Sequence, residues 1–176
     1  IDYDEADVVA HYVGDFQYAP PASSLIGMHG GSKGGYWSSK RWPYFTRLSE
    51  ELKARGFRVA SFGTADEYIA GTENLTGGSI YQMTEALRGC DYMISNDSGV
   101  MNIAAALGIP TLSIFGPTDP GTRAPVAPQH HFIAHHRGSG PCEVTAQSAF
   151  KAGLCNCINQ ISVERALSGF EELLKR

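Results

Sequence analysis

The sequence predicts an α/β fold built as a doubly wound parallel sheet of the Rossmann-like kind. Apolar runs of strand length alternate along the chain with segments whose apolar residues recur at helical spacing. Residues 109–115 read as a strand buried in a parallel sheet. Right-handed crossovers between such strands would bring a ligand to the carboxyl ends of the sheet.

The composition is that of a single globular domain of ordinary size. The chain has 176 residues, of which 43% are hydrophobic, and no apolar run approaches the roughly 20 residues of a membrane span. A net charge of −4 without clustered Lys and Arg argues against a nucleic-acid partner. Because the chain begins at Ile1 without a methionine or a signal peptide, we expect a fragment of a longer protein.

The first elements predict a linker followed by one βαβ unit. Residues 1–23 are acidic and then rich in Pro and Ala, as in an interdomain linker, and we expect the domain over residues 24–176. Residues 25–29 predict a strand that ends in a glycine-rich loop. Pro43 fits the first turn of the helix that follows, and residues 57–62 predict the next strand.

The alternation of strands and helices continues through the rest of the chain. Residues 79–87 predict a helix with Ile80, Met83 and Leu87 on one face, and a strand follows at Tyr92. The remaining elements are expected in this order: a short strand at Phe132 and Ile133, a loop that carries cysteines, and a helix over residues 162–174.

The most informative stretch is a turn between a strand and a helix at residues 96–99. The apolar run before it stops there, and the apolar residues after it recur at helical spacing. A helix start offers unpaired backbone N–H groups and the positive end of the helix dipole, so it can hold a phosphate. Ser98 would donate from its hydroxyl, and Gly99 would let the backbone approach. The simpler alternative is that Asp97 or Ser98 only caps the helix.

A second loop is expected at the same edge of the sheet. The strand over residues 109–115 delivers the segment Gly-Pro-Thr-Asp-Pro, residues 116–120, to the carboxyl ends of the strands. Thr118 would add a hydroxyl from this side, while Pro117 and Pro120 would hold the loop in shape. The two loops would then face one ligand.

These motifs together resemble the donor-site signature of the family 9 glycosyltransferases, the ADP-heptose:lipopolysaccharide heptosyltransferases. The family has an Asp-Ser/Thr-Gly turn, an alanine-rich helix and a Phe/Tyr-Gly-Pro-Thr-x-Pro loop, and this chain matches each of them. Residues 40–43, Lys-Arg-Trp-Pro, resemble the family's Lys-x-Trp-Pro helix entry. Phe62 and Gly63 followed by Glu67 resemble its strand, glycine and ribose-binding acid.

The resemblance implies roles for individual residues. Lys40 matches the lysine that contacts phosphate, where its ammonium would stabilise the departing diphosphate. Glu67 matches the acid that accepts hydrogen bonds from ribose hydroxyls; the alternative is an early-helix residue that interacts favourably with the dipole. Asp97 is assigned to the binding site without a role as a base, and we expect its carboxylate to turn toward backbone N–H groups because it would repel a diphosphate.

One position departs from the family pattern. Asn102 stands where the family commonly has a His in the helix after the Asp-Ser/Thr-Gly turn. An imidazolium gives charge to a phosphate, whereas an amide offers only a neutral donor. This leaves a second hypothesis open, in which the chain is a nucleotide-binding module that keeps the fold and has lost transfer.

The cysteines support a third hypothesis, a Cys/His metal-binding domain. Cys142, Cys155 and Cys157 fall in the late loop region, and four histidines precede them: His130, His131, His135 and His136. No Cys-x-x-Cys pair occurs, so we assign no metal ligands, and we expect free thiols rather than disulfides. Cys90 is expected to be a small buried hydrophobe.

The function expected from the resemblance is that of the donor-binding half of a GT-B glycosyltransferase. The full protein would move a heptose or similar sugar from a nucleotide-sugar, ADP-linked by resemblance, to a saccharide acceptor such as lipopolysaccharide core, with inversion and without a metal or other cofactor. The acceptor site and the catalytic base would lie in an amino-terminal domain outside this chain, so the chain alone would bind without turnover. The family implies a cytoplasmic location and allows peripheral association with the inner face of the cytoplasmic membrane.

Overall fold

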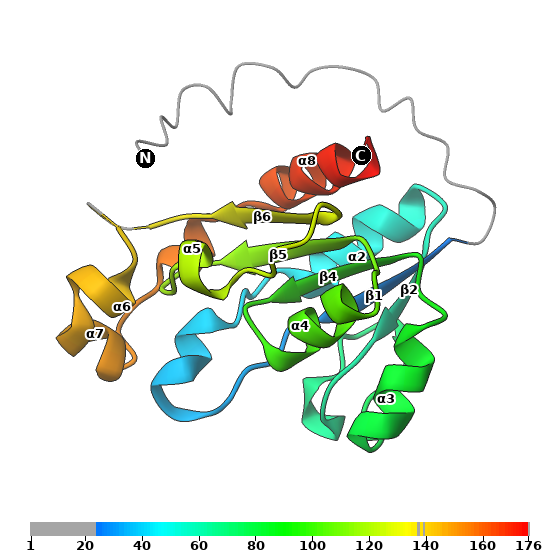
Figure 1. Ribbon diagram of the computed structural model, residues 1–176, viewed down its shortest axis with the longest axis horizontal. Coiled ribbons are helices and arrows are strands. Elements are labelled where there is room, and N and C mark those ends of the chain that lie inside the picture. The colour runs from blue at the N-terminus through cyan, green and yellow to red at the C-terminus, as the bar shows by residue number, and fades with distance from the viewer. Residues whose placement is uncertain (1–23, 137, 139, 176) are drawn as a thin grey trace.

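The computed structural model describes residues 24–136, 138 and 140–175, so the predicted linker over residues 1–23 lies outside the described part. A six-stranded sheet with the strand order β3-β2-β1-β4-β5-β6 runs through the centre of the molecule (Figure 1). Every neighbouring pair of strands is parallel. The strands are β1 (Leu25–His29), β2 (Arg58–Ser61), β3 (Glu73–Asn74), β4 (Tyr92–Asn96), β5 (Thr111–Phe115) and β6 (His130–Ala134). This order confirms the doubly wound prediction.

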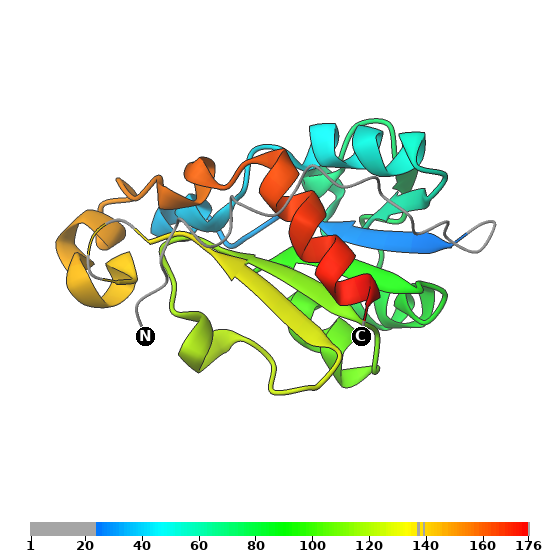
Figure 2. The same cartoon turned by 90° about the horizontal axis from the view of Figure 1, so that it is seen from above.

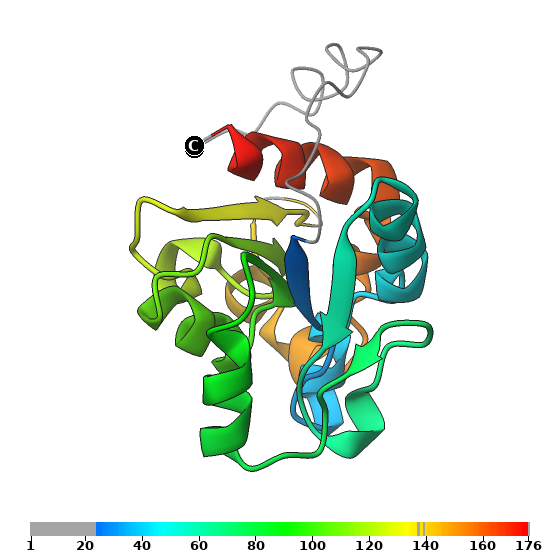
Figure 3. The same ribbon diagram turned by 90° about the vertical axis from the view of Figure 1, so that its right-hand side faces the viewer.

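Helices cover both faces of the sheet (Figure 3). On one face, α2 (Phe45–Ala54) and α8 (Val163–Leu174) pack over a core that includes Ile26, Leu52 and Phe170. The other face carries α3 (Ile80–Leu87) and α4 (Gly99–Ala106). The side chains of β1 alternate between the two cores, which is the pattern that a strand covered on both faces requires.

Shorter helices fill the loops at the carboxyl ends of the strands. They are α5 (Pro120–Arg123), α6 (Cys142–Thr145), α7 (Gln147–Lys151) and the 3-10 turns η1 (Gly35–Lys40), η2 (Ala65–Glu67) and η3 (Cys157–Gln160). Figure 2 shows α6 and α7 at one end of the molecule. There α7 packs against η1 through edge-on contacts of Phe150 with Tyr36 and Trp37. No helix in the described ranges is both long and apolar enough to cross a membrane.

Helix α2 begins later than the sequence predicts. Pro43 precedes the first helical residue, Phe45, by two positions and does not lie in the first turn. Trp42 anchors the chain before the helix. It is buried, and its backbone N–H donates to Asn96 Oδ1 at 3.3 Å. The indole N–H of Trp42 also donates to Ile161 O at 2.8 Å. After these anchors the chain turns at Pro43 and Tyr44, and Tyr44 is the N-cap of α2.

The apolar face predicted for α3 is wrong at its first residue. Ile80 is 69% exposed, whereas Leu87 is buried and Met83 packs against the core from a partly buried position. Helical spacing identifies a common face but not how far along the helix the sheet extends. Ser79 and Gln82 form a capping box at this helix start.

Two other differences concern segments without a clear apolar pattern. The region predicted as a cysteine-bearing loop contains α6, α7 and η3, each too short to show a helical repeat. Strand β3 has only two exposed polar residues and gives no strand signal in the sequence. The other predicted strands and helices are confirmed, with ends that shift by one or two residues.

Candidate functional site

A lysine and an aspartate meet where the strand order reverses, between β1 and β4. Lys40, the last residue of η1, donates from Nζ to Asp97 O at 2.7 Å and to Asp97 Oδ2 at 3.1 Å. The two side chains are only 12% and 9% exposed. In doubly wound sheets, ligands bind at this reversal point outside the carboxyl ends of the strands. We call Lys40, Asp97, Ser98 and Gly99 the switch-point site.

The Lys40–Asp97 pair corrects one expectation. Asp97 was expected to turn its carboxylate toward backbone N–H groups, but its Oδ2 instead pairs with the Lys40 ammonium. Asp97 therefore positions the cation that the sequence assigned to phosphate. A ligand phosphate would approach an ammonium that is already ordered.

The start of helix α4 is open to a ligand on one side. Ser98 is the N-cap, and its Oγ accepts from Met101 N–H at 3.3 Å and lies 3.0 Å from Ser95 Oγ. The alternative reading of Ser98 as a cap is thus correct for its hydroxyl in this structure. A Cβ added at Gly99 would meet no atom within 4 Å other than those of its chain neighbours and its own helix backbone. The space beside Gly99 is free for an anion at the positive end of the helix.

Asn102 lies one turn into the same helix. Its side-chain Nδ2 donates to Ser98 O at 3.2 Å, and the residue is exposed. The amide that replaces the family's common His therefore bonds to its own helix. No ligand contact is required to satisfy this donor.

The loop after β5 carries a hydroxyl without a partner. Thr118 is fully buried, and its Oγ1 makes no hydrogen bond to any residue that the structure describes. Close packing requires a glycine at position 116, because a Cβ there would lie 2.4 Å from Ile158 Cβ. An unsatisfied buried hydroxyl costs free energy unless a ligand or water pairs with it.

Three residues beside this loop were missed by the sequence reasoning. The indole ring of Trp37 has Lys40 Nζ at 4.9 Å and Arg123 Cζ at 5.5 Å from its centroid. Arg123 also forms a bidentate pair with Glu143, with N–O distances of 2.6 to 3.1 Å. The only sequence signal was the place of Arg123, three residues after the Gly-Pro-Thr-Asp-Pro segment.

Glu143 ties this arginine to the loop. Its Oε1 accepts from Asp119 N–H at 2.6 Å, and its own N–H donates to Pro117 O at 3.0 Å. Burial opposes ionisation of the Glu143 carboxyl, but the hydrogen bonds from Arg123 and Asp119 outweigh it and lower its pKa. Glu143 is therefore a carboxylate that holds the loop and the guanidinium together.

Glu67 lies in η2, at the carboxyl end of β2. Its Oε2 accepts from Thr64 N–H at 2.8 Å, as the early-helix interpretation implies, and lies 3.9 Å from His29 Nδ1. A Cβ on Gly31 would come within 1.8 Å of Glu67 Oε1, so the glycine loop must lack a side chain there. Burial lowers the pKa of His29, whose Nδ1 lies 3.0 Å from Phe62 O. The predicted ribose contact of Glu67 stays a prediction.

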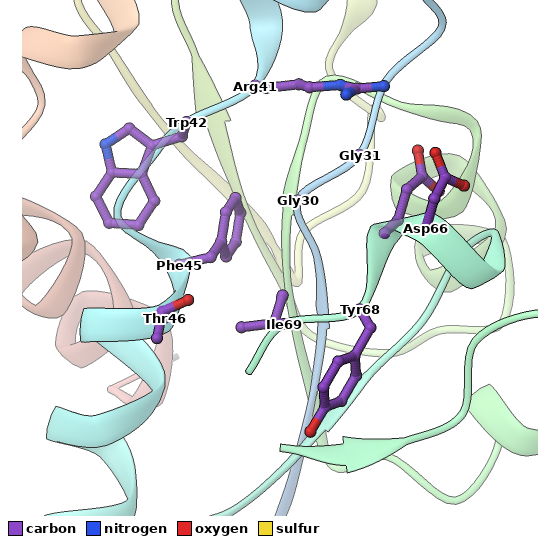
Figure 4. A pocket seen from close by; sticks show the side chains of 10 residues that line it. Gly30, Gly31, Arg41, Trp42, Phe45, Thr46, Asp66, Tyr68 and Ile69 are labelled. Atoms are coloured by element: carbon purple, nitrogen blue, oxygen red, sulfur yellow. The ribbon is translucent and has the colours of Figure 1, made fainter. Parts of the chain in front are cut away.

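A pocket of about 190 Å³ adjoins Glu67. In Figure 4, the Arg41 side chain extends toward the side of the pocket on which Asp66 lies. Phe45, Ile69 and Tyr68 also line this pocket. The pocket is smaller than the roughly 300 Å³ at which sites for whole small molecules begin. It can hold one ring of a larger ligand, with carboxylates available to accept hydroxyl hydrogens.

Cys142 begins α6, Cys155 follows α7 and Cys157 begins η3, and these three buried residues are called the thiol cluster. Cys142 Sγ lies 3.8 Å from Cys157 Sγ, and the three thiols line a cavity of about 250 Å³. Burial, together with the neighbouring Cys142 thiol, raises the pKa of Cys155 and of Cys157 to about 12. Buried Cys90, whose pKa burial also raises to about 12, matches its prediction as a small hydrophobe.

The metal hypothesis finds no support in this geometry. Within the described ranges, no group of three or more His, Cys, Asp or Glu side chains is arranged to hold a metal ion. The histidines are spread along β6 and beyond it, and His136 contacts Gly116 O through Nδ1 at 2.9 Å.

Comparisons with known proteins agree with the fold. Residues 17–152 match the family model described as glycosyltransferase family 9 (heptosyltransferase). Lipopolysaccharide heptosyltransferase 1 of Pseudomonas aeruginosa is 38% identical over 114 residues, which are 58% of this chain and 31% of that protein. Lipooligosaccharide heptosyltransferase 2 of Haemophilus influenzae is 28% identical over 169 residues, 86% of this chain and 48% of that protein.

A solved structure shows the same architecture. The structure of E. coli ADP-heptose lps heptosyltransferase II superimposes with a TM-score of 0.70 and 25% identity, covering 88% of this chain and 47% of that one. A family 9 glycosyltransferase from Veillonella parvula gives a TM-score of 0.71 at 22% identity and covers 87% of this chain and 46% of that one. The chain spans about half the length, or less, of the relatives it matches.

Proposed function

Because the chain belongs to glycosyltransferase family 9, we propose that it is the donor-binding half of an inverting glycosyltransferase of the GT-B type. The donor is a nucleotide-sugar, ADP-linked, and the sugar is a heptose or a close relative. The observation that carries this proposal is the ordered Lys40 ammonium beside the open start of α4, at the sheet's reversal point. The matched E. coli structure is named for ADP-heptose, which agrees with this donor.

The diphosphate is proposed to bind between Lys40 and the first turn of α4. Lys40 would exchange its contact with Asp97 Oδ2 for a phosphate oxygen while keeping the bond to the Asp97 carbonyl. As the bond to the sugar breaks, charge grows on the departing diphosphate. A fixed ammonium and a helix start stabilise that charge without a metal ion. Thr118, whose buried hydroxyl lacks a partner in the described structure, would donate to the same anion.

Glu67 is proposed to bind the ribose. Its carboxylate adjoins the small pocket at the ends of β1 and β2, and Oε2 is already oriented by Thr64 N–H. A carboxylate in this place of a doubly wound fold accepts hydrogen bonds from two ribose hydroxyls. The pocket volume of about 190 Å³ suits one sugar ring.

The acceptor and the general base are proposed to lie in a second domain. This chain spans about half of its relatives, so a transferase would need further sequence to bind a saccharide acceptor such as lipopolysaccharide core. There a carboxylate would deprotonate the acceptor hydroxyl. We place the reaction in the cytoplasm, with the full protein associated peripherally with the inner face of the membrane.

The test is calorimetric titration of the chain with ADP, UDP and GDP at one salt concentration. The proposal predicts selective binding of ADP that is weakened by Lys40→Ala and by Glu67→Ala. Lys33→Ala is the matched control, because Lys33 is an exposed lysine of the glycine-rich loop. Equal binding of all three nucleotides, or none, would contradict an ADP-linked donor. A nucleotide-binding module without transfer would bind ADP equally, and sugar transfer by the two-domain protein distinguishes it from the enzyme.

A further inference from the structure

We propose that Arg123 is a second diphosphate-binding cation of the donor site and that Glu143 is the residue that positions it. This inference rests on the proposed function, since it assigns a further residue to the same nucleotide-sugar. Neither residue belongs to the motifs that identified the site. Lys40 and Arg123 share a contact with the indole ring of Trp37.

The two cations lie over one aromatic ring. Lys40 Nζ is 4.9 Å and Arg123 Cζ is 5.5 Å from the centroid of Trp37. A cation over an indole ring is attracted by the ring's negative face. Trp37 thereby contacts both Arg123, from the loop after β5, and Lys40, from the loop after β1. The Asp97 carboxylate contributes to the raised pKa of Arg123, and the Lys40 ammonium contributes to the lowered pKa of Glu143. The Lys40–Asp97 pair and the Arg123–Glu143 pair therefore lie near each other.

Arg123 keeps one nitrogen available. Its Nε and Nη2 donate to Glu143, whereas Nη1 makes no hydrogen bond in the described structure. The side chain is 36% exposed, so an anion can reach it. A guanidinium with one edge fixed by a carboxylate presents its remaining N–H groups in a defined direction.

Glu143 couples this direction to the loop of Thr118. The same carboxylate accepts from Asp119 N–H, and the Glu143 N–H donates to Pro117 O, so the residues on each side of Thr118 are bound to one side chain or its backbone. A binding group that is held before the ligand arrives loses less entropy on binding.

The experiment is a comparison of ADP and AMP binding to the chain and to Arg123→Ala. A second cation on the diphosphate predicts that Arg123→Ala weakens ADP binding about tenfold or more, as expected for lost hydrogen bonds to a charged group. AMP binding should fall by less than about threefold, so the ratio of ADP to AMP affinity should drop. Arg123→Lys should give an intermediate loss because it keeps the charge without the fork.

Two further variants keep the test decisive. Arg58→Ala is the matched control, because Arg58 forms a bidentate pair with Glu73 at the amino end of β2, and it should leave both affinities unchanged. Glu143→Gln should lower the ADP to AMP ratio in the same direction by a smaller factor. Equal losses of ADP and AMP, or no loss in Arg123→Ala, would overturn the inference alone. Failure of the unaltered chain to bind ADP would overturn the proposed function together with it.

Discussion

The switch-point site and the thiol cluster each bring together side chains of types that bind ligands, but the surroundings of the two clusters differ. At the switch-point site, the charged side chains of Lys40 and Asp97 are largely buried and paired with each other, and the space beside Gly99 is open. In the thiol cluster, three side chains of potential ligands turn toward one another and toward Phe150, Tyr36 and Trp37. The first arrangement leaves donors for a ligand, and the second places thiols and apolar side chains around a cavity of about 250 Å³.

Residue type alone does not make a binding site. Cysteines close in sequence suggested metal chemistry, and the fold places them in a small core that supports η1, the turn that ends at Lys40. Lys40 and Asp97 are 57 positions apart, and the parallel sheet joins them. Rapid reaction of the cluster thiols, or a lack of nucleotide binding at the switch-point residues, would contradict this difference.

The largest expected effect concerns thiol reactivity. The pKa of about 12 for Cys155 and Cys157 means that their thiolate fraction at pH 8 is very small, and it rises only as the pH approaches that value. We expect the folded chain to react with iodoacetamide at least about a hundredfold more slowly than the chain in denaturant. Mass spectrometry of the alkylated cysteines measures both rates, and comparable rates would break the contrast between the two regions.

The next effect is on nucleotide binding. Lys40→Ala should weaken ADP binding about 10- to 100-fold, because it removes charge-assisted hydrogen bonds to the diphosphate. It also leaves Asp97 buried without its cation, and the free energy of unfolding should fall by about 3 kcal/mol. Calorimetry and chemical denaturation give the two quantities. A Lys40→Ala variant that binds ADP normally would remove Lys40 from the site.

A smaller loss is expected at Gly99. A Cβ there meets no atom within 4 Å beyond its chain neighbours and its own helix backbone, and it would occupy the space proposed for phosphate. Gly99→Ala should therefore weaken ADP binding about tenfold while the unfolding free energy stays the same or rises slightly, since Ala favours helix. Gly89→Ala, outside the site, serves as the matched control. If Gly99→Ala lowered stability and left affinity unchanged, the glycine would be structural.

The smallest effect is expected at Asn102. Restoring the family's common residue with Asn102→His should leave ADP affinity unchanged or tighten it by a few-fold, because the imidazolium adds charge near the phosphate. The gain should be larger at pH 6 than at pH 8, where a His of ordinary pKa is neutral. Weaker binding of Asn102→His at both pH values would argue that the amide bond to Ser98 O shapes the helix start.

Much of this molecule could be predicted from its sequence because the strands carry strong local signals. The strands at Leu25–His29 and Tyr92–Asn96 and the helix start at Ser98 each follow from apolar runs and a capping residue. The Lys40 and Asp97 positions came from a motif, but their pairing did not, since it depends on strand order. Trp37, Arg123 and Glu143 were missed because their contacts are tertiary and leave no periodic pattern.

Amide NMR spectra of the chain titrated with ADP would show whether a nucleotide diphosphate binds at the switch-point site. We expect the largest shifts on the amides of Lys40, Asp97, Ser98, Gly99 and Val100, with smaller shifts at Thr118 and none at the thiol cluster. Shifts confined to the thiol cluster or to other surfaces, with the switch-point amides unmoved at saturating ADP, would contradict this expectation.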